Sequence, residues 1–296
     1  MKTIAKQSNR KAAFTIVELL TVMSIIVILI GLLVPALNKV RIYAKTVKQY
    51  AQFHSIEAAI ELFSNAFDGY PESGGLDSTG ASYCGAMKLC EAMMGQDLLG
   101  FHSNSILRGD GMDASGKIDL YPPGATDLSA RKGPYLPPES ADAVGIEKIW
   151  GVGKTGPFVP GPGRVYRVLC DVYTRKLASG TKLGMPILYY KADTRGSLHD
   201  ASRAGAMTPL DSQNNIYNFY DNQELLELGV PGAPAGAPPY PLSVPARFYK
   251  NTLSDKIPIT TPRPFRADTY ILISAGYDAE YGTADDICNF EWRYVD

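Results

Sequence analysis

Four carboxylates stand close together near the C-terminus, where they could bind a metal ion. The apolar stretch 270–274 runs into a loop that contains Asp278, Glu280, Asp285 and Asp286. Hard oxygen ligands that follow a strand suit Ca²⁺, which takes about 6–8 oxygens. A cation would also relieve the repulsion between the carboxylates. The same residues could form a solvated acidic turn, and composition leaves both interpretations open.

A single carboxylate, Glu18, lies inside the most apolar stretch of the chain. Residues 14–37 read FTIVELLTVMSIIVILIGLLVPAL, and Glu18 is their one charge. At about 1.5 Å per residue, a helix of this length spans a hydrocarbon core of about 30 Å. An unpaired carboxylate there is costly, so Glu18 is a functional candidate. If the chain is cut between Ala13 and Phe14, the new amine could pair with Glu18 of a neighbouring copy and set the register.

The residues before this stretch are basic, whereas the chain as a whole carries a net charge of −1. A basic leader before an apolar run is the positive-inside pattern, which keeps the leader cytoplasmic. A secretory signal peptide would have a shorter apolar region, about 7–15 residues, and a cut after it. A plain signal anchor would leave Glu18 unexplained. The overall charge gives no indication of nucleic-acid binding.

The apolar stretch continues into an amphipathic segment, residues 38–67, in which apolar residues recur at steps of three and four. This spacing predicts one long helix from 14 to about 66, kinked or loosened near Gly31 and Pro35. The sequence Asp-Gly-Tyr-Pro at 68–71 ends the helix.

The remaining chain predicts a mixed globular region. Residues 72–163 are rich in Gly, Pro, Ser and Asp, with a short helix expected within 86–99 and another near 220–228. A long helix followed by spaced strands predicts an α+β domain whose antiparallel sheet covers one side of the helix. Runs rich in Val, Ile, Tyr and Phe predict strands at 165–173, 187–190, 246–249, 270–274 and 290–295. No nucleophile–base constellation indicates an enzyme.

Four cysteines, Cys84, Cys90, Cys170 and Cys288, all follow the apolar stretch. An even number in an exported domain is compatible with disulfides, which could pair in three ways. The local option joins Cys84 to Cys90 and leaves Cys170 with Cys288; the alternative is four buried thiols.

The N-terminal segment resembles the prepilins of type IV pili and the pseudopilins of type II secretion. The residues that carry the resemblance are KAA at 11–13 and FTIVELL at 14–20. Pro35 follows Phe14 by 21 residues, where the family commonly has a helix-kinking proline. Ala13 stands where the family usually has Gly.

The resemblance implies a pilin-like α+β fold with a large irregular insertion, and a route of assembly. A prepilin peptidase would cut between Ala13 and Phe14, Phe14 would be N-methylated, and Glu18 and Pro35 would serve assembly. The implied parts are a basic leader at 1–13, a membrane and filament-core helix at 14–37, its amphipathic continuation at 38–67, and a globular domain at 68–296.

The C-terminal segment resembles the calcium loop of the major pseudopilin, with its S-x-G-x-D-G…G-T-x-D-D-I pattern, over residues 274–287. Ala279 stands where that family has Gly. The Ca²⁺ ligands implied by the resemblance are Asp278, Asp285, the carbonyl of Ala275, and also Asp286 and Thr283.

These resemblances imply a structural subunit of a filament, most like a type II secretion pseudopilin, and not an enzyme. Its partners would be copies of itself, other pilin-like subunits, the prepilin peptidase, an inner-membrane platform and membrane lipid. It would cross the bacterial inner membrane once, with the C-terminal domain in the periplasm or on an extracellular filament. The alternatives are a surface type IV pilin for adhesion, motility or DNA uptake, and a membrane-tethered glycan-binding or enzymatic domain.

Overall fold

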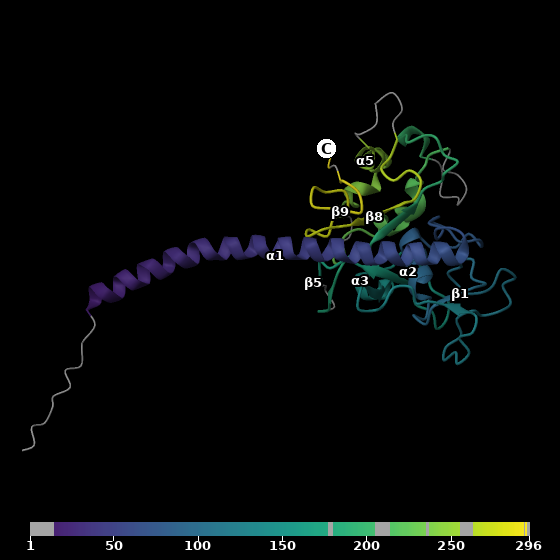
Figure 1. Cartoon of the computed structure of the whole chain (residues 1–296), viewed down its shortest axis with the longest axis horizontal. Helices are drawn as coiled ribbons and strands as arrows, with labels where there is room; N and C mark the ends of the chain where they lie inside the picture. The colour runs from purple at the N-terminus through teal and green to yellow at the C-terminus, as the bar shows by residue number, and fades with distance from the viewer. Residues whose placement is uncertain are drawn as a thin grey trace, which may run out of the picture. The chain divides into compact units, whose positions relative to one another are not determined.

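Figure 1 shows the computed structural model of the chain, which divides into two compact units, one up to Lys45 and one from Thr46 onward. The long helix α1, Ile16–Phe67, contributes residues to both units. The predicted combination of a long apolar N-terminal helix with antiparallel strands is confirmed. The structure describes residues 15–176, 180–204, 214–234, 237–254, 263–292 and 294.

In the first unit, α1 is an apolar helix with no protein around it. Every residue from Thr15 to Ala44 is exposed, and most of these residues are Ile, Leu or Val. Pro35 lies inside α1 without ending it. The ribbon in Figure 1 curves gently there and does not break.

In the second unit, one face of α1 enters the core. Phe53, Ile56 and Ile60 are buried, and the Phe63 ring meets Phe101 edge-on with centroids 5.1 Å apart. The buried face of α1 begins at Gln49. The apolar spacing within residues 38–67 therefore predicts the buried face correctly from Ile56 onward, and it is wrong before Ile56. The prediction is wrong there because two polar side chains, Gln49 and Gln52, take buried positions and hydrogen-bond to the backbone of another segment.

Two glutamines tie α1 to the backbone after β4, Arg167–Cys170. Gln52 donates to the carbonyl of Cys170 at 2.9 Å, and Gln49 accepts from the N–H of Val172 at 3.0 Å. These amides take the buried positions because they satisfy backbone groups that would otherwise lose water.

A left-handed residue ends α1. Asp68 has φ of 57°, and the N–H of Gly69 donates to the carbonyl of Ser64 at 3.2 Å. This is the 6→1 hydrogen bond of a Schellman cap, with Asp68 at the position where Gly is most common. The predicted end of the helix at residues 68–71 is therefore confirmed.

In the described residues the strands form four small antiparallel sheets, so the single sheet predicted on one side of the helix is wrong. The three-stranded sheet has β8, Tyr270–Ser274, between β7, Leu188–Lys191, and β9, Ile287–Cys288. Because β8 is the central strand, all of its residues are buried. The two-stranded sheets pair β1, Phe101–His102, with β2, Arg131–Lys132; β3, Asp142–Gly145, with β4; and β5, Arg175–Lys176, with β6, Lys182–Leu183.

Short helices complete the second unit. The strand predicted at 246–249 is wrong, because these residues lie in helix α5, Pro245–Asn251, where Pro245 occupies the first turn that its fixed φ favours. The strand predicted at 290–295 falls partly outside the described residues. The remaining helices are α2, Gly85–Met94; α3, Ile146–Trp150; α4, Gln223–Glu227; and the 3₁₀ turns η1, Ala201–Arg203; η2, Phe219–Asn222; and η3, Pro241–Ser243.

The segment expected to be an irregular insertion joins the common core through α2, every residue of which is buried. Its centre is the carboxylate of Glu91, which accepts hydrogen bonds from Tyr83 at 2.6 Å and Ser105 at 2.6 Å, and from Gln96 and Tyr121. Burial raises the pKa of Glu91, and these donors oppose the shift. One helix residue thus fixes three loops.

Candidate functional site

The first turn of α1 is closed by a reciprocal pair of side chains, Thr15 and Glu18. The N–H and the hydroxyl of Thr15 donate to Glu18 Oε2 at 2.9 and 2.8 Å. In return, the N–H of Glu18 donates to Thr15 Oγ1 at 3.2 Å. This is a capping box, in which two of the four free N–H groups of a helix start find acceptors. Glu18 therefore has a role within its own chain, which the sequence interpretation missed.

The helix that this cap begins is long and apolar enough to cross a membrane. None of its most apolar window is buried by the described protein. An uninterrupted apolar surface of this size needs a cover of lipid or of other chains.

The two further hydroxyls of the apolar stretch, those of Thr21 and Ser24, also find hydrogen-bond acceptors within α1. Thr21 donates to the carbonyl of Glu18 at 2.9 Å, and Ser24 donates to the carbonyl of Leu20 at 2.7 Å. Bonds of this kind leave no hydroxyl donor in need of water, which suits an apolar environment. The predicted processing residues Ala13 and Phe14 lie outside the described residues.

The predicted calcium ligands lie on the connection between β8 and β9. Asp285 Oδ2 accepts from the N–H groups of Tyr277 at 2.6 Å and Asp278 at 3.0 Å, which folds the loop across itself. Thr283 Oγ1 donates to Asp285 Oδ1 at 2.8 Å. Asp286 Oδ2 accepts from the N–H of Gly282 at 2.7 Å. The short hairpin therefore brings Asp278, Thr283 and Asp285 together, as predicted from their spacing.

Burial disfavours the ionised forms of the carboxylates in this loop. Burial, with help from the Asp285 carboxylate, raises the pKa of Asp278 to about 6. Burial raises the pKa of Asp286 well above its usual range. Burial also opposes ionisation of Asp285, but the hydrogen bonds from Asp278, Thr283 and Tyr277 outweigh it and lower its pKa. A bound cation would stabilise the ionised forms of all three.

The fit of this loop to a calcium ion is partial. No group of three or more His, Cys, Asp or Glu side chains within the described ranges is arranged to hold a metal. The donor chemistry nevertheless fits at Asp285 Oδ1 and Asp286 Oδ2, because each accepts one hydrogen bond and keeps a second lone pair. The loop conformation also fits the resemblance, because Ala279, which stands where the family has Gly, has φ of 63°.

All four cysteines are free and buried. The local pair Cys84–Cys90 cannot close, because Cys84 is the N-cap of α2 and Cys90 lies six positions along it, about 9 Å at 1.5 Å per residue. A disulfide needs Cα atoms within about 7 Å. Cys170 lies on β4 and Cys288 on β9, and no bond joins them. In this structure the four thiols stay separate, which corresponds to the alternative of four buried thiols. Burial raises the pKa of Cys84 and of Cys90 to about 12.

Comparisons of the chain with protein-family models, curated proteins and solved structures return no match.

Proposed function

We propose that the chain is a structural subunit of a type IV pilus-like filament, most like a type II secretion pseudopilin. The observation that carries the proposal is the capped apolar helix, which is exposed over its whole first half and continues into the core of a folded unit. Lipid covers this helix before assembly, and copies of the chain cover it in the filament. The subunit acts mechanically and catalyses no reaction.

Glu18 serves two roles in this proposal. Within the chain it caps α1 through one oxygen, Oε2, and in the filament its other oxygen, Oε1, takes a second partner. After removal of residues 1–13, the amine of Phe14 in a neighbouring copy supplies that partner. The cap holds the carboxylate in one position, so the pairing selects one axial register.

Three variants separate the cap from the charge. Glu18→Gln keeps an acceptor for the Thr15 N–H and removes the charge, because Gln also serves in capping boxes. Glu18→Ala removes both, and Thr15→Ala removes half of the cap and keeps the charge. We expect all three to insert into membranes, and the filament yield to fall strongly in both Glu18 variants and little in Thr15→Ala.

The measurement is the amount of filament sheared from cells, together with mass spectrometry of the mature N-terminus, where Phe14 should be first and methylated. If Glu18→Gln assembles as well as the unaltered chain, the pairing is wrong. If the mature chain keeps residues 1–13, the whole proposal fails.

Calcium binding by the β8–β9 loop is part of the same proposal. The ion would be held by Asp278 and Asp285, with Asp286, Thr283 and the Ala275 carbonyl completing the set, and it would fix the hairpin by screening its carboxylates. Ca²⁺ binds ionised carboxylates, and Asp278 has a pKa of about 6. Binding should therefore weaken as the pH falls below about 6.

Thermal unfolding of the full chain in detergent micelles tests this. Added CaCl₂ should raise the unfolding midpoint by about 2–4 °C per kcal/mol of binding free energy at about pH 7.5, and less at about pH 5. Asp285→Asn should abolish the shift, and Glu280→Gln, a neighbouring acid outside the ligand set, should keep it. Equal midpoints in CaCl₂ and in EGTA would remove calcium from the proposal.

A surface type IV pilin is the second candidate. The observation that favours it is the insertion around α2, whose buried residues make it a structured face and not a disordered loop. Both candidates share the anchor and the route of assembly, and the calcium experiment favours the first if the ion binds.

A further inference from the structure

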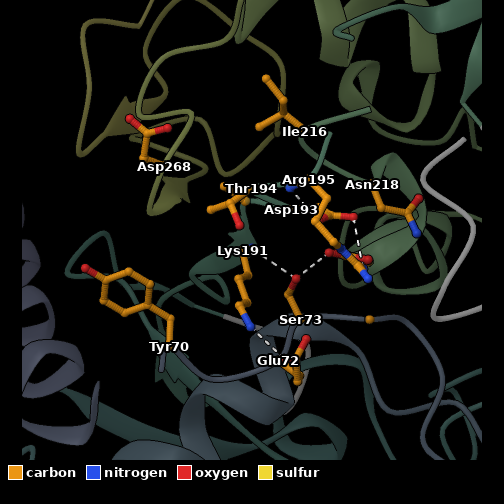
Figure 2. A pocket seen from close by; sticks show the side chains of 13 residues that line it. Tyr70, Glu72, Ser73, Lys191, Asp193, Thr194, Arg195, Ile216, Asn218 and Asp268 are labelled. Atoms are coloured by element: carbon orange, nitrogen blue, oxygen red, sulfur yellow. Dashed lines mark hydrogen bonds and ion pairs between the residues drawn. The ribbon is translucent and has the colours of Figure 1, made fainter. Parts of the chain in front are cut away.

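A polar cleft opens in the second unit. Its volume is about 440 Å³, within the range of about 300–1,000 Å³ usual for small-molecule sites. Its walls come from three places in the sequence: the loop after α1 at 70–74, the end of β7 with its following turn at 191–195, and the segment 216–221 (Figure 2). Asp268 lies at its edge.

The floor of the cleft is held rigidly by a buried polar cluster. Ser73 donates to the carboxylate of Asp221 and accepts from the N–H of Lys191 at 2.9 Å. Behind it, the ammonium of Lys88 donates to the carbonyls of Gly74 at 2.6 Å and Leu76 at 2.8 Å. Because these bonds join all three walls, the cleft is formed before any ligand arrives, which lowers the entropic cost of binding.

Each charge of the cleft has an opposite charge near it. Lys191 pairs with Glu72 at 2.6 Å, and Arg195 pairs with Asp193 at 3.1 Å. Figure 2 shows both pairs among the side chains that line the cleft.

The same balance extends to the floor and the edge. Asp268 lies 3.9 Å from Arg263, and Asp221 faces Lys88, whose ammonium attracts its ionised form. A ligand with a net charge of either sign would therefore gain little electrostatic attraction in the cleft.

The lining instead offers donors and acceptors side by side with a small apolar surface. Asn218 contributes an amide, Thr194 contributes a hydroxyl, and Tyr70 and Ile216 contribute an aromatic ring and an aliphatic group. Burial raises the pKa of Asp221 to about 7, so near neutral pH its carboxyl both donates and accepts. Groups that hydrogen-bond in both directions match hydroxyls, which also do both.

We infer that this cleft binds a neutral, hydroxyl-rich ligand, a sugar unit of a glycan, between the 191–195 turn and Asn218. The paired charges orient the sugar hydroxyls, and the half-buried ring of Tyr70 covers the C–H face of the sugar. This site does not depend on filament assembly, and it would serve a tethered or a filamentous chain equally.

Saturation-transfer NMR on the full chain tests the inference in lauryldimethylamine oxide micelles, a detergent without a sugar head group. The probes are the methyl glycosides of glucose, galactose, mannose and N-acetylglucosamine. Glucose 6-phosphate and glucosamine are the anionic and cationic comparisons on the same ring. We expect transfer to at least one neutral glycoside, and weaker transfer to both charged sugars.

Three variants locate the binding. Thr194→Trp fills the cleft from an exposed position and should weaken binding by about tenfold or more, which is about 1.4 kcal/mol. Arg195→Ala, which releases Asp193, should weaken it less, and Arg203→Ala, an exposed arginine outside the cleft, should leave it unchanged. Circular dichroism checks that each variant is folded.

Three results would overturn the inference: transfer to none of the neutral glycosides, stronger transfer to either charged sugar, or unchanged binding in both Thr194→Trp and Arg195→Ala. None of these results bears on the Glu18 experiment, so failure here is separable from failure of the filament proposal.

Discussion

Ala279 occupies a backbone conformation, φ of 63°, that costs an L-residue about 1–2 kcal/mol. Ala279→Gly removes that strain, but it also loses a buried methyl worth about 0.8 kcal/mol and adds about 0.5–1 kcal/mol of chain entropy. We expect the free energy of unfolding to change by less than about 0.5 kcal/mol, because these terms nearly cancel.

The matched control is Ala275→Gly in the same loop. Ala275 is fully buried and does not have a positive φ, so it has no strain to lose. It should cost about 1.5 kcal/mol. Urea unfolding of both variants measures the difference, and equal losses would mean that the left-handed conformation at residue 279 carries no strain.

Asp221 gives the second unit a pH dependence that one variant isolates. Its pKa is about 7 in the folded chain and 3.8 ordinarily, so the folded state binds the proton more tightly. The stabilisation that this proton gives is complete below the ordinary pKa and is lost as the pH rises through about 7. Asp221→Asn keeps the acceptor for Ser73 and cannot ionise.

The free energy of unfolding of Asp221→Asn relative to the unaltered chain should therefore rise by about 2 kcal/mol between pH of about 5 and 8. The difference between variants is the measured quantity, because His199, whose pKa burial lowers to about 4, titrates with the opposite sign in both chains. A constant difference across this range would show that Asp221 ionises as freely as an exposed acid.

Single residues differ in how far the sequence reveals them. Glu18 stands out as the one charge in an apolar run, and the Thr-x-x-Glu spacing of its cap is also readable. Ser73 and Asp221 carry no such signal, because their contact joins residues 148 positions apart.

At the scale of elements, the C-terminus of α1 gives a test of the cap. Asp68 is exposed and left-handed, so Asp68→Gly should relieve strain without losing buried surface. We expect a gain of about 0.5–1 kcal/mol in the free energy of unfolding. Asn65→Gly, three residues earlier in the exposed last turn of α1, should instead cost about 0.3 kcal/mol, the difference between the helix propensities of Asn and Gly. Urea midpoints that move in the same direction for both variants would contradict the Schellman assignment.

The elements with strong local signals are those that the sequence predicts well. The length and end of α1 follow from its apolar run and its Asp-Gly-Tyr-Pro stop, and β8 follows from five consecutive apolar or β-favouring residues. The segment 246–249 has strand-forming aromatics, yet the preceding Pro245 starts a helix there. The buried face of α1 also escapes prediction at Gln49 and Gln52, because amides that pair with distant backbone look like surface residues in a sequence.

At the scale of the whole molecule, the two units should be separable. The second unit begins at Thr46, and the buried face of α1 begins just after it at Gln49. A chain that starts at Thr46 should be soluble without detergent, run as a monomer in size-exclusion chromatography and unfold cooperatively on heating.

A chain that starts at Glu57 is the matched control, because it lacks the buried side chains of Phe53 and Ile56. Loss of two such side chains costs about 4–10 kcal/mol, comparable with the total stability of a domain. This shorter chain should not fold. If the Thr46 chain is also unfolded, the apolar half of α1 is needed for the core and the division into two units is wrong.

The polar cleft could not be predicted from the sequence. Its lining spans from Tyr70 to Asp268, and no two of its walls are adjacent in the chain. Only the fold brings them together. The acidic loop lies within one hairpin, so its members could be grouped from their spacing alone.

The cap of α1 has a consequence for maturation. Thr15 and Glu18 both follow the proposed cut between Ala13 and Phe14, and the three hydrogen bonds of the cap join these two residues. Cleavage before Phe14 should therefore leave the hydrogen bonds in the first turn of α1 intact. A subunit could lose its leader without unwinding a turn, and the newly freed amine would emerge next to a helix that is already set.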